Sequence, residues 1–226
     1  MERPFVYVNM AMTADGKITS AHREEPQFTS RRDKRSMDKL RAEADAVLIG
    51  AGTLRGDDPP LHIRDDEMKA YRRSLGKPEH PLNVLVTASA AVDAWARFFK
   101  RDRAAWCIVA TVEDAPAAQR SALAQVAEVW TLGRGRVDLA AVLSLLTERG
   151  VARLLVEGGG ELNWSLFADD LVDELYVTVA PAILGGRDAP TLCEGAGFEM
   201  AGRRPLRLLS SEAIDGEIYC RYAVVR

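Results

Sequence analysis

The sequence is poor in cysteine, has no excess of positive charge and contains no long apolar run, and each shortage excludes a class of protein. The three cysteines, Cys107, Cys193 and Cys220, are widely spaced and odd in number, which excludes a disulfide framework and a Cys-x-x-Cys metal site. The formal net charge of −3 at pH 7 argues against a general nucleic-acid binder, because such proteins need a basic surface.

No apolar stretch is long enough to cross a membrane and no signal-peptide pattern occurs, so we expect a soluble, cytoplasmic protein. The chain has 226 residues, of which 47% are hydrophobic, and this is enough to bury a full core. No internal repeat and no long linker divides it. We therefore predict a single domain over residues 1–226.

Short apolar runs alternate with helical patterns along most of the chain. Runs typical of strands cover residues 5–12, 46–49, 83–86, 105–110, 126–131, 153–156 and 174–179. Apolar residues at helical spacing cover residues 31–43, 115–125 and 139–148. Ser30 is a suitable N-cap and Gly150 a suitable stop, whereas the polar segment 64–81 is interpreted as an excursion. The alternation predicts an α/β fold with a mainly parallel sheet and helices on both faces.

The C-terminal part has a different pattern. Two strand-like runs, at residues 206–214 and 217–225, flank Asp215-Gly216, a pair typical of a type I′ hairpin turn. Strands joined by so short a turn are antiparallel. The sheet is therefore predicted to be mixed, with an antiparallel hairpin at its C-terminal end.

A turn of three glycines is the most informative feature of the chain. Gly158-Gly159-Gly160 follows the apolar run Leu154-Leu155-Val156-Glu157 and precedes a helical pattern. Glycines let backbone N–H groups approach a ligand, and a helix N-terminus adds partial positive charge. The turn therefore suits a pyrophosphate, and hence a nucleotide cofactor. The alternative is a sharp strand-to-helix loop that binds nothing.

A second glycine-rich turn is expected at residues 50–59, after the apolar run 46–49. Neither turn matches G-x-G-x-x-G, because Arg55 and Asn163 stand where the last glycine would be, and a conventional Rossmann site is not expected. If both turns lie at carboxyl ends of strands in one sheet, they face a single crevice, where open α/β sheets bind ligands.

Charged side chains near these turns have both ligand-binding and structural explanations. Arg41 lies at the end of a helix, where it either binds a phosphate or belongs to a polar face that is only solvated. Arg64 either binds a ligand or pairs with Asp57-Asp58 on the surface. Asp57-Asp58 either cap a turn or contact ribose hydroxyls or a pyrimidine edge. Glu157 ends a buried-looking strand, where a carboxylate needs a ligand or an N–H partner.

Several motifs occur in an order that resembles a known family. They are Val8-Asn9-Met10-Ala11-Met12-Thr13-Ala14-Asp15-Gly16-Lys17-Ile18, Leu40-Arg41-Ala42-Glu43-Ala44-Asp45-Ala46, Gly50-Ala51-Gly52-Thr53, Asp57-Asp58-Pro59-x-Leu61-x-x-Arg64, Glu157-Gly158-Gly159-Gly160, Val172-Asp173-Glu174-Leu175 and Ala180-Pro181. Together they resemble the reductases of riboflavin biosynthesis, the RibD C-terminal domain family, which has a dihydrofolate-reductase-like fold. The resemblance covers nearly the whole chain.

The resemblance implies NADPH-dependent reduction of a pyrimidine that carries ribose 5-phosphate, with hydride delivery to C1′ that turns the ribosyl group into ribityl. Asn9 and the lack of a fused zinc deaminase look most like the archaeal and fungal branch, whose substrate is 2,5-diamino-6-(5-phosphoribosylamino)pyrimidin-4(3H)-one. The bacterial branch reduces the deaminated uracil instead. His22-Arg23-Glu24 spells H-x-E, but no P-C-x-x-C follows it, so no deaminase site is expected.

Site residues carry over from the family one at a time. The implied cofactor contacts are Thr53, Asp57, Thr87, Gly158, Gly159, Gly160 and Leu162. The implied substrate contacts are Asn9, Arg41, Asp58, Leu61, Arg64 and Glu157. Asp15 and Glu157 are the residues assigned to catalysis. Many relatives have Asp-Ser after the third strand, whereas this chain has Thr87-Ala88-Ser89, so Thr87 or Ser89 is expected to replace a contact at Ala88.

No metal is expected, because the nicotinamide carries the chemistry of hydride transfer. His62 lies close to the substrate contacts and is interpreted as a bystander. Arg97, Arg101 and Arg134 are candidates for a contact with the cofactor 2′-phosphate. The resemblance and the apolar residues of the C-terminal hairpin imply a homodimer. The alternatives are another NADPH-dependent pteridine or pyrimidine reductase on the same fold and a non-catalytic nucleotide-binding protein.

Overall fold

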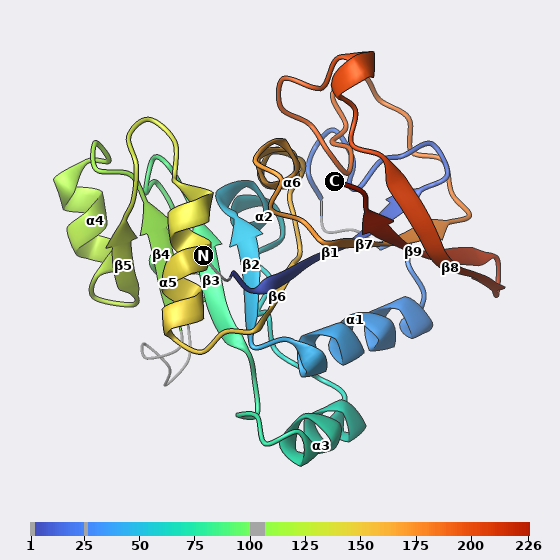
Figure 1. Cartoon of the computed structure of the whole chain (residues 1–226), viewed down its shortest axis with the longest axis horizontal. Coiled ribbons are helices and arrows are strands. Elements are labelled where there is room, and N and C mark those ends of the chain that lie inside the picture. Colours follow the sequence, from blue (N-terminus) through green and yellow to red (C-terminus); the bar gives the residue numbers. More distant parts are fainter. Residues whose placement is uncertain (1–2, 25–26, 100–106) are drawn as a thin grey trace. The chain divides into compact units, whose positions relative to one another are not determined.

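The computed structural model describes residues 3–24, 27–99 and 107–226 (Figure 1). Contacts within the chain divide it into two compact units. Unit 1 comprises residues 1–4 and 38–155, and unit 2 comprises residues 5–37 and 156–226. The predicted single domain over residues 1–226 stays a prediction.

Unit 1 is built on a row of paired strands. In the order of their pairing, these are β5 (Glu128–Thr131), β4 (Cys107–Thr111), β3 (Leu82–Val86), β2 (Ala46–Gly50) and β6 (Arg153–Val156), the last residue of which belongs to unit 2. The pairs β2–β3, β3–β4 and β4–β5 are parallel. Every residue of β2 and β4 is buried, as is typical of parallel strands covered on both faces.

The helices of unit 1 are the C-terminal part of α1 (Arg31–Glu43), α2 (Ala51–Asp57), α3 (Asp66–Ser74), α4 (Ala117–Leu123) and α5 (Leu139–Glu148). α1 and α5 have the predicted bounds, and Gly150, with a φ of +80°, follows α5 as expected of a helix stop. α4 is shorter than the predicted helix at 115–125.

Two helices of unit 1 differ from the sequence interpretation. The polar excursion at 64–81 contains α3, which Asp65 caps by accepting a hydrogen bond from the N–H of Met68 at 3.1 Å. The prediction of an open glycine-rich turn at residues 50–59 is also wrong. Helix α2 starts at Ala51, directly after β2, so Gly52 and Thr53 are helical.

Unit 2 contains a mixed set of strands, in the pairing order β1 (Phe5–Thr13), β7 (Glu174–Ala180), β9 (Glu217–Val224) and β8 (Leu206–Ile214). β1 and β7 are parallel, whereas β9 is antiparallel to both β7 and β8. Asp215 and Gly216 have φ values of +52° and +87°, which is the type I′ geometry predicted for the hairpin turn. The mixed sheet with a C-terminal antiparallel hairpin is thus confirmed.

The remaining helices of unit 2 are α6 (Gly160–Ala168), the 3-10 helix η2 (Met200–Gly202) and the N-terminal part of α1. Ser30 caps α1 as predicted, because its hydroxyl accepts the N–H of Asp33 at 3.2 Å. The N–H and the hydroxyl of Ser30 in turn donate to the carboxylate of Glu217 at 2.7 and 2.6 Å. The start of α1 is therefore fixed to strand β9.

Candidate functional site

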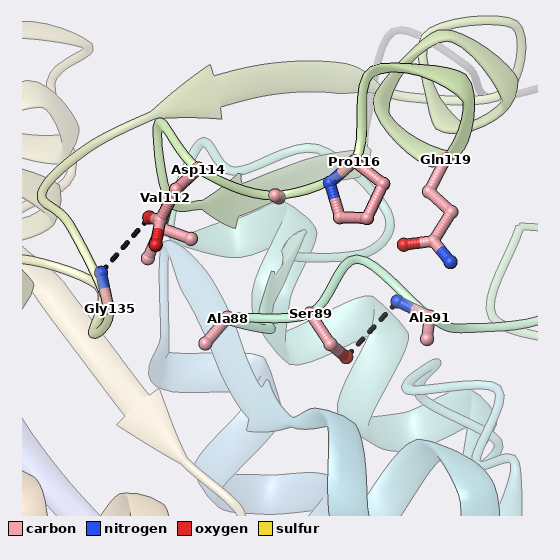
Figure 2. A pocket seen from close by; sticks show the side chains of 9 residues that line it. Ala88, Ser89, Ala91, Val112, Asp114, Pro116, Gln119 and Gly135 are labelled. Carbon is pink, nitrogen blue, oxygen red and sulfur yellow. Dashed lines mark hydrogen bonds between the residues drawn. The ribbon is translucent and has the colours of Figure 1, made fainter.

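A hollow of about 390 Å³ lies at the carboxyl ends of three strands of unit 1 (Figure 2). Its walls come from the segments that follow β3, β4 and β5 and from the start of α4: Ala88, Ser89, Ala91, Val112, Asp114, Ala115, Pro116, Gln119 and Gly135. Because these strands are parallel, their carboxyl ends meet at one edge, which is where open α/β sheets bind ligands.

Polar groups at this edge fit a nucleotide. Thr87 Oγ1 and Gln119 Oε1 are buried and have no hydrogen-bond partner among the described residues. Figure 2 shows the Gln119 amide extending from α4 toward the segment that carries Ser89 and Ala91. Amide and hydroxyl groups are suitable partners for an adenine edge and for ribose. Asp114 accepts the N–H of Gly135 at 3.0 Å, and this hydrogen bond lowers the pKa of the carboxyl.

Two predicted cofactor contacts, Thr53 and Asp57, lie on α2, which starts at the carboxyl end of β2. Since β2 is parallel to β3, α2 belongs to the same edge as the hollow. Both residues are half-buried. The backbone carbonyl of Asp57 accepts a hydrogen bond from the Arg97 guanidinium at 2.8 Å.

The loop of residues 58–65 carries three of the predicted substrate contacts and has an unusual backbone. Asp58 and Leu61 have φ values of +41° and +42°, and Leu61 is only 1% exposed. The carboxylate of Asp58 accepts the backbone N–H groups of Arg97 and Phe98 at 2.7 and 3.2 Å. Asp58 is therefore the capping member of the Asp57-Asp58 pair, and its contact with substrate stays a prediction.

Arg41 and Arg64, the predicted phosphate ligands, lie on either side of one buried carboxylate. Arg41 Nη1 is 3.9 Å from Asp38 Oδ1, and Arg64 Nε is 4.0 Å from Asp38 Oδ2. The Arg41 side chain is 4% exposed, whereas that of Arg64 is 48% exposed. The structure thus brings together two arginines that are 23 positions apart in the sequence, and it pairs Arg64 with Asp38 rather than with Asp57-Asp58.

The glycine turn of unit 2 leads into α6 as predicted, with Gly159 as the N-cap. Gly158 has a φ of +85°, and a Cβ atom there would lie 2.8 Å from the sulfur of Met10. A Cβ atom on Gly160 would lie 2.7 Å from the carbonyl oxygen of Thr191. Packing therefore explains two of the three glycines. Gly159 has an ordinary φ of −81° and is half-buried, so its backbone conformation does not require a glycine, and its contact with the cofactor stays a prediction.

Backbone N–H groups at the start of α6 fit an anion. The first N–H groups of a helix have no partner within the helix, and Gly160 to Leu162 are in this position. The Leu162 side chain is buried, so its predicted contact with the cofactor would come from its backbone N–H. Glu157 follows β6 directly and is half-buried, and Asn9 is half-buried within β1. Their contacts with ligand stay predictions.

Asp15 holds a loop in place. Its carboxylate accepts the Thr13 hydroxyl at 2.6 Å and the N–H groups of Gly185 and Leu184 at 2.7 and 3.2 Å. These hydrogen bonds, that from Thr13 above all, lower the pKa of Asp15 to about 2. The group is therefore ionised at neutral pH and is not suited to donate a proton. Its assignment to catalysis stays a prediction.

The three candidates for the 2′-phosphate contact have different settings. Arg134 pairs with Glu113 at 2.7 Å, and the guanidinium of Arg97 contacts Asp57 and Asp58. Arg101 lies outside the described residues.

In the part of the chain that the structure describes, no three His, Cys, Asp or Glu residues gather as metal ligands would. No helix in that part has the length and apolar character needed to cross a membrane.

Sequence reasoning missed three groups at these sites. Asp38 had one available signal, since it lies three positions before Arg41 on the same helix face. His80 is buried, and its Nδ1 accepts the N–H of Ile63 at 3.3 Å, whereas Gln119 lines the hollow. Neither had a signal, because their roles depend on segments that are distant in the sequence.

Comparisons with known proteins show the family of the chain. Residues 4–220 match the model of the RibD C-terminal domain family. The chain is 41% identical over 196 residues to the 2,5-diamino-6-ribosylamino-4(3H)-pyrimidinone 5′-phosphate reductase of Archaeoglobus fulgidus, covering 87% of this chain and 89% of the relative. It is 36% identical to the protein of the same name from Methanothermobacter thermautotrophicus, covering 98% and 99%.

Solved structures show the fold. A pyrimidine reductase-like protein from Corynebacterium diphtheriae superposes with a TM-score of 0.87 at 22% identity, covering 99% of this chain and 92% of that one. A dihydrofolate reductase from Enterococcus faecalis gives a TM-score of 0.55 at 10% identity, covering 98% and 97%. The predicted dihydrofolate-reductase-like fold is confirmed.

Proposed function

Because the chain belongs to the RibD C-terminal domain family, we propose that it reduces the ribosyl group of 2,5-diamino-6-(5-phosphoribosylamino)pyrimidin-4(3H)-one to ribityl in riboflavin biosynthesis. The observation that carries this proposal is the 41% identity to an archaeal reductase named for this substrate, over 87% of the chain. The paired arginines around Asp38 support it, since they suit the phosphate of such a substrate.

We propose NADPH as the cofactor. When bound, it supplies a hydride from its nicotinamide ring. Two features of the chain support the assignment. In unit 1, Gln119 lines the hollow at the carboxyl edge, and Thr87 directly precedes Ala88, which also lines it. The Gln119 amide oxygen and the Thr87 hydroxyl have no hydrogen-bond partner among the described residues. In unit 2, the N–H groups at the start of α6 suit a pyrophosphate.

The substrate phosphate is assigned to unit 1. Arg64, which is half-exposed, offers its guanidinium to solvent, and Arg41 supports the loop of residues 58–65 from behind by donating to the carbonyl oxygen of His62 at 2.9 Å. Two guanidinium groups on one phosphate provide charge-assisted hydrogen bonds in a fixed direction. Because a phosphate has no part in the hydride step, this contact binds and orients the substrate.

Reduction at C1′ adds one hydride and one proton while the ring C1′–O bond of the sugar opens. Asp15 is ionised at neutral pH and serves to hold the loop that contains Leu184 and Gly185. Glu157 is the other residue assigned to catalysis, and it directly follows β6. We propose that it faces the sugar and the pyrimidine, where a carboxylate can position a hydroxyl or an amine.

We also propose a homodimer. All residues of β8 except the last are exposed in the isolated chain. They include Leu206, Leu208 and Leu209, which are 38–52% exposed, and Ile218 on β9 is 45% exposed. Apolar side chains along an edge strand are typical of a surface that another chain covers. Light scattering should give a mass of about twice 24.8 kDa, and a mass near 24.8 kDa at every concentration would refute the dimer.

The proposed reaction is tested by incubating the purified protein with NADPH and each of the two phosphoribosylamino-pyrimidines, and following the loss of NADPH absorbance. We expect turnover of the diamino compound. Turnover of the deaminated uracil alone would replace the substrate by that of the bacterial branch. If neither compound is reduced, the riboflavin-pathway assignment is wrong.

A further inference from the structure

Asp38 is a buried carboxylate at the centre of the proposed phosphate site. It lies on α1 and is only 3% exposed. Its Oδ2 atom accepts the backbone N–H groups of Arg64 and Asp65 at 3.2 and 3.1 Å. Its Oδ1 atom has no hydrogen-bond partner among the described residues and is 3.9 Å from the guanidinium of Arg41.

Burying a carboxylate is costly unless hydrogen bonds and opposite charges offset the loss of water. Two backbone N–H groups and two guanidinium groups surround Asp38, but both guanidinium distances, 3.9 and 4.0 Å, are longer than a hydrogen bond. The carboxylate is therefore close enough to attract both arginines without forming a tight ion pair with either. Such an arrangement holds the two guanidinium groups next to one buried negative charge, and the Arg64 side chain is 48% exposed.

The carboxylate also sets the backbone that carries Arg64. Side chains from outside the loop of residues 58–65 support its backbone: Arg41 donates to the His62 carbonyl, His80 accepts from Ile63, and Asp38 accepts from Arg64 and Asp65. Asp38 is the support nearest to Arg64. One side chain thus fixes the main chain of Arg64 and faces the guanidinium of Arg41.

We propose that Asp38 is a positioning residue that directs Arg41 and Arg64 onto one phosphate group of the substrate. This inference rests on the proposed function. The competing explanations have different consequences. If Asp38 only stabilises the fold, its loss affects phosphorylated and unphosphorylated ligands alike. If it acts mainly as a negative charge near the site, its neutralisation tightens phosphate binding.

Asp38→Asn is the test variant, because an asparagine oxygen can still accept the two backbone N–H groups while the charge that faces Arg41 is lost. Asp45→Asn is a closely matched control. Asp45 Oδ2 accepts the consecutive N–H groups of Ala152 and Arg153 at 2.9 and 2.8 Å, and its Oδ1 pairs with Lys77 at 2.7 Å. It has the same chemistry in the same unit, outside the proposed phosphate site.

The first measurement is calorimetric titration of each variant with ribose 5-phosphate and with ribose as the probes. We expect Asp38→Asn to weaken ribose 5-phosphate binding by about tenfold, the lower end of what loss of an orienting partner costs in metal sites, and Asp45→Asn to leave it unchanged. Tighter binding by Asp38→Asn, or an equal loss for ribose, would overturn the inference. So would a wild type that binds ribose 5-phosphate no better than ribose.

The second measurement is steady-state kinetics with the diamino pyrimidine. Asp38→Asn should raise KM for the phosphorylated substrate by a similar factor with kcat nearly unchanged, and the effect should shrink when Arg64→Ala is already present, because the two residues act together. If the wild type reduces the substrate and Asp38→Asn has an unaltered KM, the inference is wrong and the proposed function stands. If the wild type reduces neither pyrimidine but shows Asp38-dependent binding of ribose 5-phosphate, the proposed reaction is wrong and the inference stands.

Discussion

The loop of residues 58–65 in unit 1 and the turn of residues 158–160 in unit 2 are both expected to bind phosphate groups, yet they are fixed in opposite ways. The loop is held by buried polar side chains from elsewhere in the unit, namely Asp38, Arg41 and His80. The turn is fixed by close packing, because glycines without side chains let Met10 and the segment around Thr191 pack directly against its backbone. The two proposed phosphate sites thus differ in kind, because one relies on directed charges and the other on accessible backbone.

The largest effect, on NADPH affinity, is expected from adding a side chain to the turn of residues 158–160. Gly159→Val should block the approach of a pyrophosphate to the start of α6, and the φ of −81° at Gly159 is one that a valine adopts. Losing two charge-assisted hydrogen bonds costs about 3–6 kcal/mol, which is more than a hundredfold in NADPH affinity. Calorimetry checks it, and unchanged affinity in a folded variant would remove the turn from the cofactor site.

The corresponding change in unit 1 removes a charge. Arg41→Ala should raise KM for the phosphorylated substrate by about tenfold to a hundredfold, since a hydrogen bond to a charged group contributes about 1.5–3 kcal/mol. NADPH affinity should barely change. Kinetics with the phosphorylated substrate and its dephosphorylated analogue provide the test. An equal loss on both compounds would make Arg41 a structural residue, which its buried hydrogen bond to His62 would then explain.

Gly160→Ala separates packing from binding within the turn. The added Cβ atom would lie 2.6 Å from Glu194 Cγ and 2.7 Å from the Thr191 carbonyl oxygen. Overpacking of this kind costs about 1–3 kcal/mol in the free energy of unfolding. Denaturant unfolding monitored by circular dichroism measures this loss, with Gly52→Ala as a control because a Cβ atom there meets nothing within 4 Å. Equal stability of the two variants would show that packing does not require a glycine at position 160.

The smallest effect, on the free energy of unfolding, concerns Glu217 in unit 2, which accepts hydrogen bonds from Ser30. Burial would raise the pKa of Glu217, but hydrogen bonds from Ser30 and Tyr219 outweigh it and lower the pKa below 4.5. The stabilisation is therefore present above pH 4.5 and is lost as the pH falls through the folded pKa. Glu217→Gln should cost about 1 kcal/mol at pH 7, and the gap from wild type should close in acid.

Asp33→Asn is the matched control for Glu217→Gln. Burial raises the pKa of Asp33. Wild-type stability due to this group is present at low pH and is lost as the pH rises through the folded pKa, so Asp33→Asn should gain stability relative to wild type over that range. Thermal unfolding from pH 3 to pH 8 measures both variants. Parallel pH profiles for the two would contradict these opposite shifts.

Much of the fold was predictable because its elements have local signals. α1, α5, β6 and β8 have the predicted bounds, since apolar periodicity and turn residues set them. α2 was missed because two glycines within seven residues indicate a turn. α3 was missed because few of its side chains are apolar. Its stability comes from the Asp65 cap and from Arg72, which donates to the carbonyls of Arg41 and Ala42 at the end of α1.

The site was predictable only in part, for a related reason. Motif order indicated Arg41, Arg64 and the glycine turn, and the structure brings the two arginines together around Asp38. Whether a carboxylate such as Asp38 is buried depends on where the loop of residues 58–65 lies, which no local pattern encodes. The orphaned oxygen of Gln119 is similar, because α4 meets the segment after β3 only in the folded chain.

Transfer of a labelled hydride tests the proposed reaction most directly. The protein is incubated with the diamino pyrimidine and NADPH that carries deuterium at both C4 positions of the nicotinamide, and the product is analysed by mass spectrometry and NMR. We predict one deuterium per product molecule, located at C1′ of a ribityl chain. A reduced product without deuterium at C1′, or no product from a folded protein that binds NADPH, would contradict the account.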